Sequence, residues 1–168
     1  EGKVFQHYEG SKNPPKELLW SGQNDQGEWI QAGRAYSPVY MFTDPGGTPF
    51  TRVGTPLRYK GIVHQERDGI HITLDSAELW GRAKANQDLT TEGVALMRSA
   101  ADLIKRRFTG LPLRVEAYAA SKELADRQAA AASDYLLKEL MLLPQDLSTD
   151  SLRTPFSDQR TEIVLVNR

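Results

Sequence analysis

Few side chains in this chain could perform acid–base chemistry. Asp75 and Glu78 stand three residues apart near the end of a predicted strand and could act as paired carboxylates. Carboxylates this close together on a surface segment are far more often solvated, so we expect no catalytic role for them. The sequence contains no Gly-x-Ser-x-Gly, His-Glu-x-x-His or phosphate-binding motif. We therefore predict that the chain is not an enzyme.

The possible metal ligands are scattered. The three histidines are His7, His64 and His71. His71 and Asp75 could share one face of a strand, because alternate side chains of a strand point the same way. A zinc site needs at least three protein ligands, and we find no third residue at a suitable spacing. The chain has no cysteine, which excludes thiolate sites and disulfides. We expect no metal and no cofactor.

Composition excludes other classes of function. The chain has 21 Lys+Arg and 22 Asp+Glu, a net charge of −1, so no basic field draws it to nucleic acid. With 39% hydrophobic residues it is typical of a folded globular protein. No apolar run approaches the ~20 residues of a membrane-spanning helix, and we expect no transmembrane segment.

The second half of the sequence alternates between strand and helix patterns. A helix is predicted after the threonine caps at residues 90–91, with an apolar stripe at Val94, Met97, Ala101, Ile104 and Phe108. A strand at residues 113–118 leads into a second helix over residues 122–140. The closing strand is expected at residues 161–166. Together with the alternating strand at residues 70–74, these elements give the order β-α-β-α-β. One additional strand could lie between the second helix and the closing strand.

The first half is rich in strand and turn signals. Residues 1–17 are polar and predict a flexible arm, and residues 18–69 predict a small β-rich module, for which an SH3-like barrel is one candidate. Within it, residues 38–42 and 57–63 form β-favouring runs. The aromatic residues of this module have two interpretations, core filling or a partner-binding face, and core filling is favoured. These residues are Trp20, Trp29, Tyr36, Tyr40 and Tyr59.

Three short segments resemble the OmpA-like C-terminal domain, which in many bacterial envelope proteins binds the stem peptide of peptidoglycan. The segment LTTEGVAL at residues 89–96 matches the opening of the family's first helix. LADRQA at residues 124–129, followed by DYL, fits the second helix, and DQRTEI at residues 158–163 is similar to the closing strand. The resemblance implies an α+β fold with helices on one face of the sheet, over a domain at residues 70–168.

The departures from the family fall on its ligand-binding residues. In the family, the strand before the second helix ends Gly-His-Thr-Asp, and that aspartate binds diaminopimelate; here Ala120 takes its place. Gln128 stands where the family has an arginine that pairs with the ligand carboxylate. Arg127 lies one position earlier, about 100° around the helix, and is typical of a solvated surface arginine. The resemblance thus implies a degenerate peptidoglycan pocket made of Tyr118, Ser121, Arg127 and Gln128.

From this resemblance we expect a non-enzymatic structural component of a bacterial cell-envelope complex, in secretion or conjugation machinery. The changed strand end is similar to that of type IVB secretion lipoproteins. Other subunits of the assembly would be the partners, and the location would be the periplasm, associated with the outer membrane. The alternative is a peptidoglycan-binding module that anchors such a complex to the cell wall.

The arm offers a partner-binding hypothesis of its own. Residues 1–17 have too few apolar side chains to fold alone, because burying them cannot offset the entropy lost on ordering. Phe5 and Tyr8 are nevertheless grouped. We expect both to pack against another subunit when the arm orders on binding.

Overall fold

The computed structural model describes residues 2–13, 15–82 and 88–167. The chain divides into two compact units, Glu1–Gln31 and Ala32–Arg168, a division that differs from the predicted boundaries after residues 17 and 69. In the first unit, the ring of Phe5 meets that of Trp20 edge-on, with centroids 5.8 Å apart. The side chain of Gln6 donates to Asp25 at 3.0 Å. The described part of the predicted arm therefore contacts residues of its own unit.

The second unit begins with two separate two-stranded ladders. β1 (Ala35–Tyr36) pairs with β4 (Leu57–Arg58), and β2 (Val39–Thr43) pairs with β3 (Pro49–Val53). Among the described residues these ladders form no barrel, so the SH3-like candidate is wrong. The strand predicted at residues 57–63 is also split, because the chain bends at residues 59–60. The turn between β2 and β3 is held by Asp44, whose Oδ1 accepts from the Thr48 backbone at 2.9 Å.

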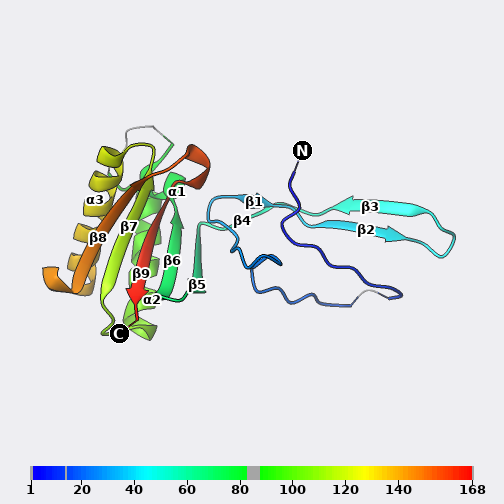
Figure 1. Ribbon diagram of the computed structural model, residues 1–168, viewed down its shortest axis with the longest axis horizontal. Coiled ribbons are helices and arrows are strands. Elements are labelled where there is room, and N and C mark those ends of the chain that lie inside the picture. The colour runs from blue at the N-terminus through cyan, green and yellow to red at the C-terminus, as the bar shows by residue number, and fades with distance from the viewer. Residues whose placement is uncertain (1, 14, 83–87, 168) are drawn as a thin grey trace. The chain divides into compact units, whose positions relative to one another are not determined.

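A five-stranded mixed sheet follows, in the order β5-β6-β9-β7-β8 (Figure 1). Its strands are β5 (Gly61–Gln65), β6 (Gly69–Asp75), β7 (Leu113–Ala119), β8 (Leu147–Arg153) and β9 (Arg160–Val166). β7 and β8 are parallel, whereas the other neighbours are antiparallel. β8 is the strand that the sequence left open. A turn at residues 66–68 joins β5 to β6, so the sheet begins at β5 rather than at the predicted residue 70.

Two long helices match their predictions closely. α2 (Thr91–Arg107) begins after Thr90, whose hydroxyl accepts from the Gly93 backbone at 2.8 Å. α3 (Lys122–Leu140) begins after Ser121, whose hydroxyl accepts from the Leu124 backbone at 3.2 Å. The short helix α1 (Ser76–Trp80) was not predicted. Two 3-10 turns, η1 (Pro144–Asp146) and η2 (Phe156–Asp158), precede and follow β8.

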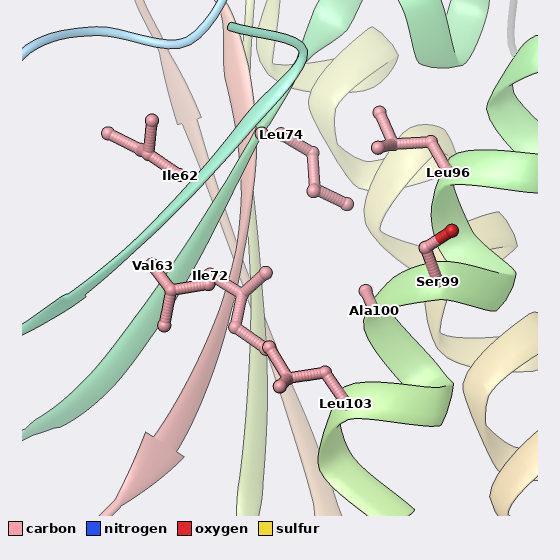
Figure 2. A pocket seen from close by; sticks show the side chains of 9 residues that line it. Ile62, Val63, Ile72, Leu74, Leu96, Ser99, Ala100 and Leu103 are labelled. Atoms are coloured by element: carbon pink, nitrogen blue, oxygen red, sulfur yellow. The ribbon is translucent and has the colours of Figure 1, made fainter.

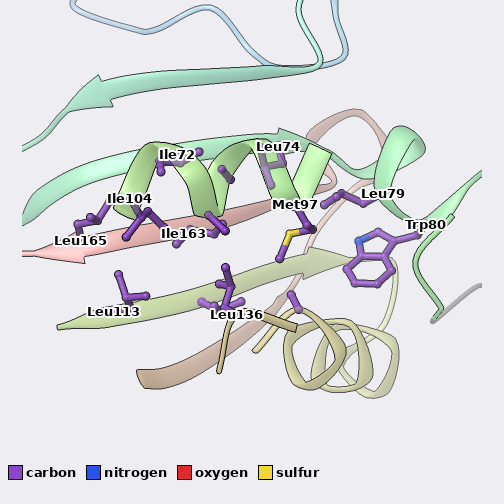
Figure 3. Packing of buried hydrophobic residues seen from close by; sticks show 14 residues of the cluster. Ile72, Leu74, Leu79, Trp80, Met97, Ile104, Leu113, Leu136, Ile163 and Leu165 are labelled. Carbon is purple, nitrogen blue, oxygen red and sulfur yellow. The ribbon is translucent and has the colours of Figure 1, made fainter. Parts of the chain in front are cut away.

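The core lies between the helices and one face of the sheet (Figure 3). Alternate residues of β6, β7 and β9 supply the sheet side, and α1, α2 and α3 supply the helix side. The buried residues include Ile72, Leu74, Leu79, Trp80, Met97, Ile104, Leu113, Val115, Leu136, Ile163 and Leu165. The prediction of an α+β fold with helices on one face is therefore confirmed.

Gly93 allows α1 and α2 to pack closely. A Cβ atom at this position would lie 2.4 Å from the backbone oxygen of Leu79, closer than any real contact. The glycine in the LTTEGVAL segment is thus required by the approach of the two helices.

No helix in the described ranges is both long and apolar enough to cross a bilayer.

Candidate functional site

The sheet face opposite the helices carries a closed network of charged and polar side chains. We call it the ion-pair ring and define it as Asp68, His71, Glu162, Arg160, Tyr118, Glu116 and Arg114. Its members come from the β5–β6 turn and from β6, β7 and β9. They occupy the positions that alternate with the core residues, which is why they share the other face. His71, Glu116 and Glu162 are less than a tenth exposed.

One half of the ring is centred on His71. Its Nε2 lies 2.8 Å from Asp68 Oδ1, and its Nδ1 lies 3.0 Å from Glu162 Oε2. The other carboxylate oxygen of Glu162 accepts from Nε of Arg160. The imidazole is thus held on both sides by carboxylates, and one of these is itself held by a guanidinium.

The other half of the ring returns through β7 to Asp68. The guanidinium of Arg160 lies over the ring of Tyr118, 3.7 Å from its centroid, a cation–π contact. The Tyr118 hydroxyl donates to Glu116 at 2.7 Å. Arg114 donates to Glu116 at 2.6 Å and to Asp68 Oδ2 at 2.7 Å, which closes the ring.

The ring shifts the pKa values of its members. The hydrogen bonds from His71 and then Arg114 lower the pKa of Asp68 to about 2. Burial opposes charge on His71, but the bonds to Asp68 and Glu162 outweigh it and raise the pKa of the imidazole. Burial likewise opposes charge on Glu162, yet its bonds from Arg160 and His71 leave its pKa below the usual value. Burial, with the bond to Glu116, raises the pKa of Tyr118 well above 10.

The four residues of the predicted peptidoglycan pocket do not share one exposed surface. Tyr118 belongs to the ion-pair ring, on the face away from α3. Ser121 caps α3, and Gln128 is buried at 4% exposure. Arg127 is exposed, as expected of a surface arginine, and its Nε donates to the Glu123 backbone oxygen at 3.3 Å. The pocket itself stays a prediction.

A small polar cluster occupies the start of α3 instead. Lys122 Nζ contacts Asp126 Oδ1 and Ser151 Oγ, each at 2.6 Å, and Ser151 in turn bonds to Asp126. The cluster ties α3 to the parallel edge strand β8. No motif in the sequence signals it, because Ser151 joins the other two only through the β7–β8 pairing. Ala120, at the position of the lost aspartate, is exposed beside it in sequence.

The carboxylate pair considered first proves structural. Asp75 is 5% exposed, so the expectation that it is solvated is wrong. It caps α1 by accepting from the Ala77 backbone at 3.0 Å and pairs with Arg58 at 2.6 Å. Glu78 pairs with Lys60 at 2.9 Å. Both carboxylates are thus neutralised by cations that precede β6 in the sequence.

Two further residues with possible metal-ligand atoms lie beside His71. His64 stands directly opposite His71 in the β5–β6 register, and Glu66 follows β5. Ligand atoms of His64, Glu66 and His71 all lie within 4.8 Å of one another. Asp75 is not part of this group. The sequence does not indicate this ligand, because His64 lies on β5 whereas His71 lies on the neighbouring strand β6.

Three of the five aromatic residues named in the predicted β-rich module at residues 18–69 lie outside any core. Trp20, Tyr40 and Tyr59 are exposed, so the favoured interpretation of these three as core is wrong. The β2–β3 hairpin, which we call the apolar hairpin, exposes large apolar side chains from both strands. They are Val39, Tyr40, Met41, Phe42, Phe50 and Val53. The rings of Phe42 and Phe50 stack across it at 5.2 Å.

An open apolar groove of about 150 Å³ lies between the β5 edge of the sheet and α2 (Figure 2). Ile72 and Leu74 approach it from the sheet, and Leu96, Ser99 and Leu103 from the helix. The lining carries no titratable side chain, so the groove offers no catalytic chemistry.

Neither a protein-family model nor a curated protein matches the chain. Solved structures do match it. The periplasmic domain of Helicobacter pylori MotB has 16% identity and a TM-score of 0.55, covering 64% of this chain and 82% of that one. An outer membrane protein from Borrelia burgdorferi B31 has 16% identity and a TM-score of 0.55, and the match covers 64% of this chain and 97% of that one. The cell wall anchor of the T6SS from Pseudomonas aeruginosa has 17% identity and a TM-score of 0.55, and the match covers 64% of this chain and 89% of that one.

These similarities confirm the resemblance at the level of the fold. The chain has the OmpA-like fold, shared with periplasmic and envelope proteins of three bacteria.

Proposed function

We propose that the chain is a non-enzymatic structural component of a bacterial cell-envelope complex, in which the OmpA-like domain acts as a scaffold. The observation that carries this proposal is the OmpA-like fold with alanine and glutamine at the positions of the family's two charged ligand anchors. The proposed location is the periplasm, beside the outer membrane, in secretion or conjugation machinery.

The replaced anchors argue against strong peptidoglycan binding. Each charge-assisted hydrogen bond contributes about 1.5–3 kcal/mol, so losing two should weaken binding by about 10²–10⁴-fold. Ala120 offers no acceptor for an ammonium group. Gln128 is neutral and 4% exposed, so it cannot pair with a carboxylate as a guanidinium would.

The apolar hairpin supports assembly with other subunits. A two-stranded hairpin is marginally stable alone in water, and this one exposes apolar side chains from both of its strands. Contiguous apolar surface of this kind marks protein–protein interfaces. Its tip is made of the polar turn that begins at Asp44, which favours a protein partner over insertion into the apolar part of a bilayer.

Site-specific photo-crosslinking in intact cells tests the scaffold proposal. A photoreactive residue at Phe42 should give discrete adducts with other envelope proteins, because this side chain is the proposed interface. Phe5 and Tyr8 supply a second set of positions, on the first unit. Arg98, exposed on α2, is the matched control and should give few adducts. A monodisperse monomer without adducts from any of these positions would refute the proposal.

A second candidate function is residual peptidoglycan binding, and two exposed cations favour it. Arg153 stands directly opposite Ala119 at the end of β7, and Arg127 lies on the first turns of α3. Either could pair with a stem-peptide carboxylate. NMR titration with a diaminopimelate-containing muropeptide separates the functions. Saturable shifts at Ser121 and Arg127, lost in Arg127→Ala, would support anchoring to the cell wall, and their absence would support the scaffold.

A further inference from the structure

His64 and His71 form a cross-strand pair near the turn of the β5–β6 hairpin, one register position before its last pair. They are direct partners in the antiparallel register, so their side chains leave the same face of the sheet. The two rings stack, with centroids 5.4 Å apart and planes inclined by 25°. Both side chains are less than a tenth exposed. Two imidazoles are thereby fixed side by side on backbone that cannot splay apart without breaking the ladder.

We propose that His64, Glu66 and His71 bind a divalent transition-metal ion of the zinc class. Their ligand atoms lie within 4.8 Å of one another, close enough for one ion to reach all three after small side-chain rotations. Glu66 lies at the turn and already approaches His64, with Oε1 3.0 Å from Nε2. A site with three protein ligands leaves a coordination position for water or for a fourth side chain.

Asp68 lies beside this group but outside it, and its carboxylate would have to shift toward the ion to become that fourth ligand. Its Oδ1 lies 2.8 Å from Nε2 of His71, the atom that would face the ion. Its other oxygen is held by Arg114 at 2.7 Å, which fixes the orientation of the carboxylate. A cation here would take the place of the hydrogen that His71 and Asp68 share. The donor set would then be two imidazoles and two carboxylates.

The ion-pair ring supplies the outer shell that such a ligand requires. Metal-binding histidines usually give their second ring nitrogen to a carboxylate, which fixes the ring and makes it a better ligand. Nδ1 of His71 lies 3.0 Å from Oε2 of Glu162, and Glu162 is oriented by Arg160. Glu162 is buried, so the imidazole is aimed by a group that solvent does not disturb.

The backbone of the turn is fixed as well. The Glu66 backbone donates to the Gly69 carbonyl at 2.8 Å, and the Asn167 backbone donates to the Asp68 carbonyl at 2.9 Å. Gly69 lies so close to β9 that a Cβ atom would be 2.1 Å from the Leu165 oxygen. The residues that bear the ligands are therefore set by the sheet rather than by a free loop.

The donor set selects the class of ion. Imidazole nitrogen suits zinc, copper, nickel and cobalt, whereas calcium and magnesium prefer oxygen ligands alone. The full chain, dialysed against chelator and then into chelator-free buffer, should bind one equivalent of Zn²⁺ by calorimetry. Co²⁺ should give visible absorption bands from low-symmetry nitrogen and oxygen coordination, and Ca²⁺ should not compete.

Variants locate the site. His64→Gln and Glu66→Gln should each weaken Zn²⁺ binding at least tenfold, and Glu162→Gln should weaken it by about 10–100-fold through the outer shell. His7→Gln, which removes the remaining histidine, is the matched control and should leave affinity unchanged. Glu66 is 46% exposed, so its variant should fold even if His64→Gln does not. No Zn²⁺ binding, unchanged affinity in folded Glu66→Gln, or a loss of affinity in His7→Gln would each overturn the proposal.

Discussion

His71 and Glu162 meet diagonally across β6 and β9, with Nδ1 of the imidazole 3.0 Å from Oε2 of the carboxylate. Arg160 holds the other oxygen of the same carboxylate. Glu162 is therefore shared by two cationic or polarised partners, His71 and Arg160, on the sheet face opposite the helices.

Replacing Glu162 by glutamine should destabilise the fold. Removing one partner of a buried ion pair costs ~3–5 kcal/mol. Because the Arg160 side chain is 31% exposed and water can partly replace the carboxylate, we expect about 2–3 kcal/mol from urea unfolding in chelator. Asp134→Asn on the exposed face of α3 is the control and should change stability by less than about 0.5 kcal/mol. Equal effects of the two variants would show that the ring does not stabilise the sheet.

Gly93→Ala should also destabilise the fold, although alanine favours helix. The new Cβ would meet the Leu79 backbone oxygen at 2.4 Å, so α1 and α2 must move apart. Overpacking of this kind costs about 1–3 kcal/mol. The melting temperature of the variant measures it. Gly10→Ala, where a Cβ would meet nothing within 4 Å, should melt as the parent does. A stabilised Gly93→Ala would contradict the close packing of the two helices.

The link between α2 and α3 should be visible in an acid titration. Lys105 Nζ donates to Glu139 Oε1 at 2.8 Å, which lowers the pKa of that carboxyl below its ordinary value of 4.5. A lowered pKa means that the pair stabilises the fold above pH 4.5 and that this contribution fades as pH falls through the folded pKa.

Lys105→Gln should therefore raise the pKa of Glu139 towards its ordinary value, as followed by carboxyl NMR shifts. Lys60→Gln is the control. It breaks a different ion pair, between Lys60 and Glu78, and should leave the pKa of Glu139 unchanged. An identical Glu139 titration in the parent and in Lys105→Gln would mean that the two helices are not linked in solution.

We expect the apolar hairpin to contribute to assembly with other subunits and not to the stability of the five-stranded sheet. Replacing Phe42 and Phe50 by serine removes a stacked pair from an exposed surface, so the melting of the purified chain should be unchanged. If these rings are interface anchors, affinity for the complex should fall at least about tenfold, measured by co-purification. Thr51→Ala on the same strand is the control. Normal incorporation of the double variant would remove the hairpin from the interface.

The helices and inner strands could be predicted because local signals and tertiary packing agree there. Thr90 and Ser121 cap their helices in the usual way, and the apolar stripes of α2 and α3 face the sheet. β8 lacks such a signal, since it is an edge strand whose residues are mostly exposed. α1 is only five residues long and depends on a cap from Asp75, which looks like a free carboxylate in the sequence.

The candidate sites were less predictable because their residues meet only in the folded sheet. The ion-pair ring joins Asp68 to Arg114 across 46 positions and His71 to Glu162 across 91. No spacing rule connects such pairs. His64 and His71 are closer in sequence, yet they form a pair only because the turn places them in direct register. The pattern of either strand alone therefore does not indicate this group of possible ligands.

The most direct test of the central claim, an OmpA-like scaffold without its ligand anchors, is co-sedimentation of the full chain with purified peptidoglycan sacculi. We expect the parent chain to remain in the supernatant, and Arg127→Ala to behave identically. Ala120→Asp combined with Gln128→Arg places charges at both anchor positions and serves as the positive comparison, provided that the fold is unchanged, since residue 128 is buried. A parent chain that pellets with the sacculi and is released by Arg127→Ala would contradict the claim, because the site would then still bind the cell wall.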